Sequence, residues 1–197
     1  LKILNLYLER VKQKDICNIL NITRGKIDAM VKKYNLTRFR SRNNYSLDEY
    51  VISLENPEFC YFLGLFASDG NIHKTNSGSE IVQFTMKDKD VLEHSKNILK
   101  YTGDIKLYNK EQGDYYFLGM VNKELVKFLK ENIAEENKTF NLKYPKFKDI
   151  NCELMFIRGF IDGDGSFTIT STENKFSFKM YCACESFLNI FSEIFTT

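Results

Sequence analysis

Two aspartates, Asp69 and Asp164, each lie at the end of an apolar, glycine-containing stretch, and the two stretches match each other. The first, residues 62–70, reads FLGLFASDG, and the second, residues 157–165, reads IRGFIDGDG. A single offset of 95 residues aligns the two aspartates and the glycines on either side of them. A duplicated motif that supplies one carboxylate per copy predicts a pseudo-twofold site where two acids meet. Such a site suits metal-assisted cleavage of a substrate that is itself roughly twofold, such as duplex DNA.

The elements that must position these acids are predicted to be two buried helices. The run Asn56-Pro57-Glu58 supplies an N-cap, a proline in the first turn and an early acid, which together indicate a helix start. The residues that follow are almost wholly apolar, so this helix must be buried. Small residues recur at every fourth position, which lets two helix backbones approach closely at Gly64 and Gly159. Close packing would bring Asp69 and Asp164 together at one end of the pair.

Strand-like alternation begins directly after each motif. Phe167 and Ile169 alternate with polar residues, and residues 81–86 and 176–181 show the same period of two. This alternation is typical of antiparallel sheets that have one buried face and one open face. Further helices and strands are expected at residues 91–100, 105–108, 115–121 and 123–133.

The charge is distributed unevenly along the chain. Residues 1–45 carry eleven Lys or Arg and three acids, a net charge of +8, which leaves −6 for the remainder. Residues 14–20 and 24–34 show helical apolar spacing around a short turn, where Thr23 is a suitable N-cap. Two short helices joined by a tight turn resemble a helix-turn-helix, whose second helix enters the DNA major groove; a helical hairpin that supports the larger domain is the alternative. The expected DNA contacts are Arg24, Lys26, Asp28 and Lys32, with Arg38, Arg40 and Arg42 in a following arm.

Composition fits an intracellular protein, cytoplasmic or organellar, rather than a secreted one. The chain has 197 residues, of which 43% are hydrophobic, enough for a sizeable core. No apolar run approaches membrane-spanning length, and the first residues show no signal-peptide pattern. The five cysteines are odd in number and lack CxxC spacing, so we expect them to be reduced.

The two matching stretches resemble the paired signature of LAGLIDADG homing endonucleases. The second copy, GFIDGDGS, is a close match, and the first is looser but keeps Gly64, Asp69 and Gly70. The resemblance covers the chain from about residue 57 to its C-terminus. It implies an α+β fold, a LAGLIDADG-type αββαββα repeat with a saddle-shaped antiparallel sheet plus a partial second repeat. A small all-α helix-turn-helix domain would precede it.

The resemblance also implies an activity. Asp69 and Asp164 would bind Mg²⁺ or Mn²⁺ at the scissile phosphates, with the carbonyl oxygens of Ser68 and Gly163 as further ligands. Lys138 would position water or stabilise phosphate charge, unless it is an ordinary exposed lysine. The reaction would be site-specific hydrolysis of both strands of double-stranded DNA. The alternative is a protein on the same fold that does not cleave, either a DNA-binding regulator or an RNA-binding maturase.

In this family the open face of the sheet lies along DNA, and its polar side chains read bases. By resemblance, the residues in this role are Asn71, His73, Gln83, Thr85, Ser166, Thr168, Thr170, Ser177, Lys179 and Tyr181. Homing endonucleases serve the mobility of introns or inteins, and the sequence leaves the host element open.

The predicted organisation has four parts: a helix-turn-helix domain (1–45), a linker (46–56), a first repeat (57–150) and a second repeat (151–197). The second repeat is incomplete, because about 80 residues follow Asp69 in the first copy whereas 33 follow Asp164. We expect an unpaired sheet edge and exposed apolar surface around Phe187, Phe191 and Phe195. A further C-terminal segment or a complementing chain would cover this surface.

Overall fold

The computed structural model describes residues 2–9, 11, 13–34, 45–110, 113–134, 138–170 and 175–196. The chain divides into two compact units, residues 1–44 and 45–197, and each is described by itself. The predicted arm with Arg38, Arg40 and Arg42 lies outside the described residues. No helix in the described part of the chain is long and apolar enough to cross a membrane.

The first unit is a small cluster of helices: α1 (Lys2–Leu8), α2 (Gln13–Leu20) and α3 (Arg24–Lys33). Its core is formed by Tyr7, Ile16, Ile27 and Val31, one or two from each helix. Helix α1 is an addition to the two helices expected from sequence, and it supplies the buried aromatic ring. The three residues between α2 and α3 make the turn, in which Asn21 has a φ of +48°, a conformation that asparagine tolerates.

The helical spacing of residues 14–20 predicted an apolar face that includes Ile19, and this was wrong. Ile19 is 62% exposed, because the buried stripe of α2 is centred on Ile16. Thr23 occupies the N-cap position of α3, but its side chain accepts no cap hydrogen bond. Instead, the backbone carbonyl of Thr23 accepts a hydrogen bond from the amide of Lys26.

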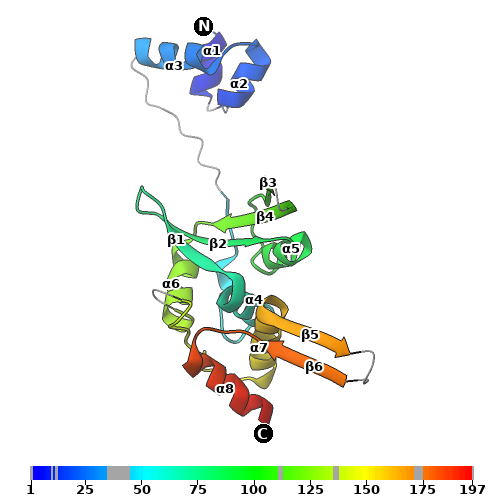
Figure 1. Ribbon diagram of the computed structural model, residues 1–197. Coiled ribbons are helices and arrows are strands. Elements are labelled where there is room, and N and C mark those ends of the chain that lie inside the picture. The colour runs from blue at the N-terminus through cyan, green and yellow to red at the C-terminus, as the bar shows by residue number, and fades with distance from the viewer. Residues whose placement is uncertain are drawn as a thin grey trace. The chain divides into compact units, whose positions relative to one another are not determined.

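The second unit contains the mixed helix and antiparallel sheet predicted from sequence (Figure 1). Its first part is α4 (Pro57–Asp69), β1 (Asn71–Lys74), β2 (Glu80–Met86), α5 (Lys89–Ile98), β3 (Lys106–Lys110), β4 (Gly113–Met120) and α6 (Lys123–Asn132). Its second part is α7 (Ile150–Asp164), β5 (Gly165–Thr170), β6 (Lys175–Met180) and α8 (Glu185–Thr196). The same element order, α-β-β-α, therefore occurs in both parts, and the motif lies in the first helix of each.

The four strands of the first part form one antiparallel sheet in the order β1-β2-β4-β3. Helices α4, α5 and α6 lie on one face of this sheet (Figure 1). That face is apolar and is covered over its central strands, where Val82, Phe84, Leu118 and Met120 are all buried. Alternate residues of the same strands point to the opposite face. The sheet thus has the buried face and the open face that the alternation predicted.

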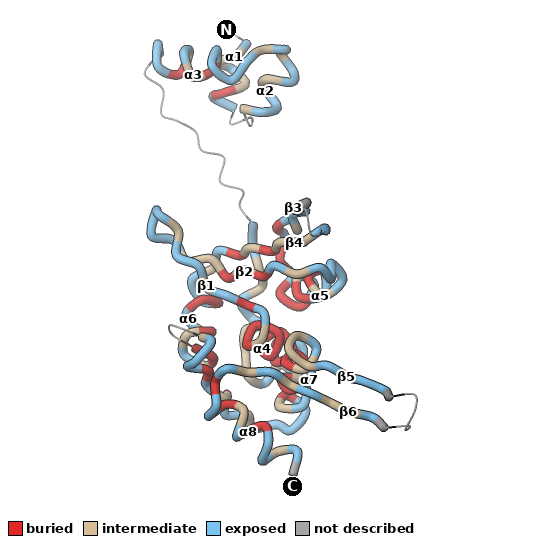
Figure 2. Tube along the Cα trace, viewed as in Figure 1, coloured by how far each residue is buried: buried red, intermediate tan, exposed pale blue. Residues whose placement is uncertain are grey.

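Helices α4 and α7 form the centre of the unit, where Figure 2 shows the buried residues concentrated. Helix α4 begins where the sequence predicts, and each helix has a side-chain N-cap. The Asn56 side chain accepts hydrogen bonds from the amides of Glu58 and Phe59, and Asp149 caps α7 by accepting from the amide of Asn151. Nine residues of α4 are buried, which accounts for its nearly continuous apolar sequence.

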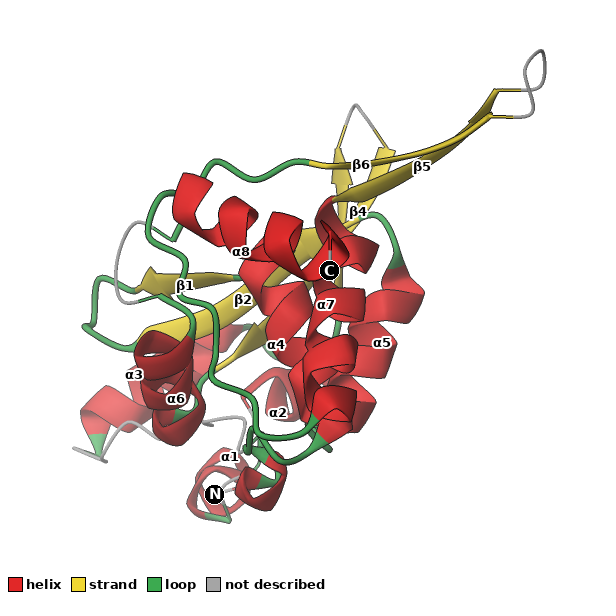
Figure 3. Cartoon of the chain, turned by 90° about the horizontal axis from the view of Figure 1, so that it is seen from below, coloured by secondary structure: helices red, strands yellow, loops and turns green. Residues whose placement is uncertain are grey.

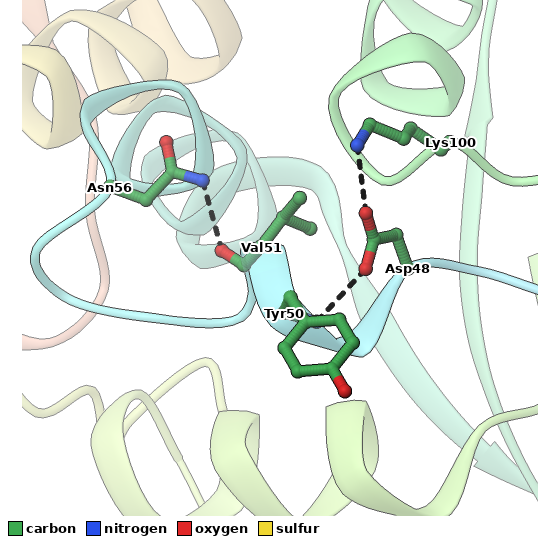
Figure 4. A network of polar contacts seen from close by, with 5 residues as sticks. All are labelled: Asp48, Tyr50, Val51, Asn56 and Lys100. Atoms are coloured by element: carbon green, nitrogen blue, oxygen red, sulfur yellow. Dashed lines mark hydrogen bonds and ion pairs between the residues drawn. The ribbon is translucent and has the colours of Figure 1, made fainter.

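Residues 46–56, predicted to be a linker, pack on the second unit. They contain a 3-10 turn, Glu49–Val51, and four of their apolar side chains lie against the core. Asp48 anchors the turn by an ion pair with Lys100 at 2.8 Å and by accepting a hydrogen bond from the amide of Tyr50 (Figure 4). Asn56 donates its side-chain N–H to the carbonyl oxygen of Val51. The polar residues of this stretch led to the prediction of a linker. Its apolar side chains contact the core, namely those of Leu47, Val51, Ile52 and Leu54.

The second part exposes apolar surface, but only partly at the place expected: Phe195 is 57% exposed, as predicted. Phe187 and Phe191 are buried, because both rings lie 5.1 Å from that of Phe160 on α7. Further exposed surface lies on the β5–β6 hairpin, which extends beyond the helices in Figure 3. Ile169 is 75% exposed and Phe176 is 65% exposed at the far end of the hairpin, whereas Phe178 on the same face is half-buried beside Phe195 of α8.

Candidate active site

Helices α4 and α7 cross in contact at their motif glycines. A Cβ atom on Gly64 would lie 2.7 Å from the backbone nitrogen of Phe160. A Cβ atom on Gly159 would lie 2.9 Å from the backbone carbonyl carbon of Tyr61. The obstacle at each glycine is therefore the backbone of the partner helix. Any side chain at either position would force the two helices apart.

This crossing brings the two motif aspartates together at the C-terminal ends of the helices. Space at Gly163 is limited by Ser68 and by the Asp69 carboxylate, whose Oδ2 would lie 2.9 Å from an added Cβ. Burial raises the pKa of both aspartates, and the negative charge of Asp69 raises the pKa of Asp164 further. Two acids that are far apart in sequence thus lie close enough for the charge of Asp69 to act on Asp164.

Lys138 holds the C-terminal end of α4. Its Nζ donates hydrogen bonds to the carbonyl oxygens of Phe66, Ala67 and Ser68 at 2.9, 2.8 and 2.7 Å. The last carbonyls of a helix have no intrahelical partners and carry partial negative charge, so a cation at this place satisfies both needs. Burial lowers the pKa of Lys138 to about 8, while the neighbouring charges of Asp164 and Asp69 act in the opposite direction. The amine therefore remains mainly protonated at neutral pH.

We expect Lys138→Met to lower the free energy of unfolding of the second unit by about 1–3 kcal/mol, because it leaves buried carbonyls without a donor. Thermal denaturation followed by circular dichroism measures this effect. The matched control is Lys143→Met, at an exposed lysine that donates to the carbonyls of Lys130 and Glu131 at the end of α6 over 3.2 and 3.4 Å. The control should lose less than about 1 kcal/mol. Equal losses in the two variants would show that Lys138 is an ordinary surface lysine.

The structure also places side chains at this site that sequence reasoning did not select. Cys182 lines a cavity of about 340 Å³ together with Lys138 and Asp164. Tyr61 donates its hydroxyl to Asp162 Oδ2 at 3.0 Å and so links α4 to α7. These contacts join segments that are 18 to 101 residues apart in sequence, and no local pattern marks them.

The donor atoms at this site are those that Mg²⁺ prefers. The two carboxylates and the neighbouring main-chain carbonyls of Ser68 and Gly163 are all hard oxygen donors. Ser68 already accepts a hydrogen bond from Lys138 through its carbonyl oxygen, which leaves one lone pair. Among the described residues there is no cluster of three or more His, Cys, Asp or Glu side chains that could hold a metal ion. A cation here would therefore depend on the facing aspartates, with water completing its shell.

Most of the residues predicted to contact bases lie on the open faces of the strands. Asn71, His73 and Thr85 are exposed, and Gln83 is half-buried, on the open face of the first sheet. In the second hairpin, Ser166 lies opposite Lys179 and Thr168 opposite Ser177, on the polar face. Tyr181 follows β6 and is 67% exposed. Thr170 pairs with Lys175 in the hairpin, and its side chain lies outside the described part.

In the first unit, α3 presents Arg24, Lys26 and Lys32 to solvent, whereas Asp28 is half-buried. The Nε of Arg24 donates a hydrogen bond to Gln13 Oε1 at 3.0 Å, which connects the first turns of α3 and α2. The exposed cations of this helix are therefore available to a negatively charged partner.

Comparison with known proteins agrees with these features. Residues 56–134 match the family described as "LAGLIDADG-like domain". An uncharacterized protein of Methanocaldococcus jannaschii is 27% identical over 146 residues, which are 72% of this chain and 49% of that protein. An intron-encoded DNA endonuclease of Dictyostelium discoideum is 32% identical over 142 residues, which are 63% of this chain and 52% of that protein. The chain thus spans about half the length of these two curated relatives.

Among solved structures, the I-LtrWI LAGLIDADG homing endonuclease bound to target DNA is 16% identical, with a TM-score of 0.34. The alignment covers 65% of this chain and 66% of that one. The family match begins at the N-cap of α4 and ends just after α6, so it contains the first motif and the whole four-stranded sheet. The domain that these residues form is therefore similar in sequence to the LAGLIDADG-like domain.

Proposed function

We propose that this protein is a site-specific, metal-dependent DNA endonuclease. The observation that carries the proposal is the meeting of Asp69 and Asp164 at the ends of two helices that cross glycine to glycine. Each aspartate comes from one copy of a duplicated motif, and each is followed at once by a hairpin with an open polar face. Two acids related in this way match the two strands of a duplex, which are themselves related by a twofold axis.

The chain's own residues prepare this site for phosphodiester hydrolysis. Asp69 and Asp164 would hold Mg²⁺ or Mn²⁺, and the carbonyls of Ser68 and Gly163 are further candidate ligands. When bound, a divalent ion supplies a more acidic water and neutralises charge that develops on the leaving oxygen. Lys138 fixes the last turn of α4 and hence the position of Asp69, and its positive charge lies near both acids. The partly enclosed setting strengthens each of these interactions relative to water.

Double-stranded DNA is the proposed substrate, with the open faces of both hairpins along the duplex and α3 in a major groove. Because this substrate lies inside cells and organelles, the proposed site of action is there as well. The basic first unit would add affinity through phosphate contacts, which carry little sequence information.

For the first unit, we expect Lys26→Ala and Lys32→Ala to weaken duplex binding by a similar factor for every sequence. Each lost phosphate contact should reduce the slope of log affinity against log salt by about 1. A salt titration of binding measures the slope. The matched control is Lys2→Ala, an exposed lysine on α1, which should leave the slope unchanged. A loss confined to one DNA sequence would assign the two lysines to base readout instead.

The apolar side chains exposed on the β5–β6 hairpin support the proposal of a second partner, a protein segment that covers them. The corresponding strand of the first repeat, β2, pairs with β4, and its apolar residues are covered by α6 and its neighbours. We therefore propose that a β-β-α segment, supplied by the same polypeptide or by a complementing chain, covers the β6 edge in the active protein. Addition of such a segment should lower the exposure of Phe167, Ile169 and Phe176 to solvent, measured by a decrease in binding of a hydrophobic dye.

The proposed activity is tested by selecting bound duplexes from a randomised library and then adding Mg²⁺ or Mn²⁺. Strand breaks at a fixed position in both strands of the selected duplexes, dependent on the ion, are the expected result. Tight duplex binding with no breaks, also after the second repeat is completed, would favour a DNA-binding regulator. Preference for structured RNA over every duplex would favour a maturase.

A further inference from the structure

The open face of the first sheet is not uniformly polar, although its polar side chains were the ones predicted to read bases. Val82, Phe84, Leu118 and Met120 are buried on the other face, so the residues between them point outward. On β4 this places Phe117 and Gly119 on the open face. On β3, Tyr108 lies opposite Tyr115, again outward, and is 47% exposed.

Three apolar side chains on this face form a continuous strip. The rings of Tyr108 and Phe117 are in contact, with centroids 5.9 Å apart and planes at 83°. The Phe117 ring leans along β4 until it covers Gly119, where an added Cβ would lie 2.8 Å from the ring. A methyl group of Ile81 approaches the same point from β2, 3.4 Å from that Cβ position. We call Ile81, Phe117 and Tyr108 the apolar strip.

Gly119 leaves room for the Phe117 ring to lie against the sheet. Glycine inside a strand weakens the sheet, and it often marks a place where a ligand approaches the backbone closely. Here its missing side chain is the space that Phe117 and Ile81 share. A larger residue would push the Phe117 ring outward, away from the sheet.

Hydrogen-bonding and charged groups border the strip on both sides. Gln83 lies directly opposite Gly119 on one side and opposite Asn71 on the other. Thr85 and Lys106 lie opposite Phe117 on its two neighbouring strands. An apolar strip between amide and cationic groups fits the major groove of DNA, where base edges alternate with thymine methyl groups between phosphate backbones.

We propose that the apolar strip contacts thymine methyl groups in the major groove, while Gln83 reads an adjacent adenine. The proposal rests on the proposed function, because it requires duplex DNA along the open face. Glutamine can donate to adenine N7 and accept from adenine N6, and apolar side chains select thymine over cytosine through its methyl group. The target bases over the first repeat would then be A·T pairs.

The ring geometry favours methyl contacts over stacking on unpaired bases. A platform for single strands presents aromatic faces on which successive bases can stack. Tyr108 and Phe117 instead meet edge to face, so their flat surfaces are not aligned along one path. Their shared edge and the Ile81 methyl offer rounded apolar contacts of the size of a methyl group.

The test removes single methyl groups from the DNA. A duplex selected by the full chain is resynthesised with deoxyuridine replacing each thymidine in turn, and affinity is measured in a buffer without divalent ions. Loss of a buried methyl contact should weaken wild-type binding about threefold to fivefold at one or two positions. Phe117→Ala should bind the thymidine duplex more weakly and show no further loss with deoxyuridine at those positions, because the two changes remove the same contact.

The control is Phe176→Ala, the same substitution at a phenylalanine on the apolar face of β6 that is more exposed than Phe117. It should keep the full deoxyuridine effect. If Phe117→Ala also keeps that effect, or if wild type shows none, the strip does not read methyl groups although duplex binding stands. If no duplex is selected, the proposed function fails and this assignment fails with it. If single strands compete better than duplex and Phe117→Ala removes that preference, the strip is a stacking platform and the methyl proposal is overturned.

Discussion

Gly64→Ala is expected to lower the melting temperature of the unit formed by residues 45–197 by about 6–12 °C. The added Cβ would lie 2.7 Å from the Phe160 nitrogen and 2.9 Å from the Phe156 carbonyl carbon. Both are backbone atoms of α7, so relief requires the two central helices to separate. Overpacking of this kind costs roughly 3 kcal/mol or more when no flexible side chain can give way, and about 2–4 °C accompanies each kcal/mol in a domain of this size.

The comparison variant is Gly25→Ala on α3, the same chemical change at a helical glycine with nothing within 4 Å of the added Cβ. It should leave the transition of the larger unit unchanged and favour its own helix, because alanine has the higher helix propensity. Gly159→Ala should act like Gly64→Ala, since its obstacle is the backbone of Tyr61. A melting temperature within about 1 °C of wild type for Gly64→Ala would mean that the helices do not cross at this point.

The second large effect concerns catalysis. Asp164→Asn and Asp69→Asn should each abolish cleavage while retaining duplex binding. Removing only an outer-shell partner of a metal ligand reduces activity by about 10–100-fold, so loss of a ligand should exceed about 100-fold. Strand breaks on a selected duplex in Mg²⁺ provide the measurement. Asp162→Asn is the matched control in the same helix turn, because Asp162 bonds to Tyr61 rather than facing Asp69. Loss of duplex binding in either Asp69 or Asp164 variant would count against a purely catalytic role.

The same two substitutions should make the folded unit more stable at neutral pH. The pKa of each aspartate is raised in the folded state, so the folded state binds the proton more tightly than the unfolded state. The free energy of unfolding therefore falls as pH rises from the pKa of the unfolded state through the pKa of the folded state. Above the folded-state pKa, the full cost of keeping the aspartates ionised in the folded protein is present. An asparagine carries no such penalty, so the gain should appear at pH 7 and disappear below the ordinary pKa of aspartate, near 3.8.

Thermal melts at pH 7 and pH 3 distinguish this electrostatic origin from a change in packing. Mg²⁺ or Ca²⁺ should raise the melting temperature of wild type, because a bound cation relieves the repulsion between the aspartates. It should not do so for either asparagine variant. A metal-induced shift of equal size in all three proteins would place the cation elsewhere.

The local sequence determined the elements of the fold but not all of their surroundings. The period-two alternation located β2 and β4, and the N-cap at Asn56 located the start of α4, because both signals depend on residues close together in the chain. By contrast, we expected apolar surface to be exposed around Phe187 and Phe191, because the second repeat is shorter than the first. Both side chains are buried. They pack on α7, and aligning the second repeat with the first could not predict this contact.

The sequence by itself determined the duplicated motif, its two aspartates and the glycines that make a close helix pair possible, because identity and spacing along the chain are sufficient for these. Only the tertiary structure decided what surrounds the acids. Lys138 reaches three carbonyls some 70 residues away, and Tyr61 bonds to Asp162 across 101 residues. The apolar strip likewise forms only when β2, β3 and β4 lie side by side, since strand register brings together residues whose spacing in sequence carries no signal.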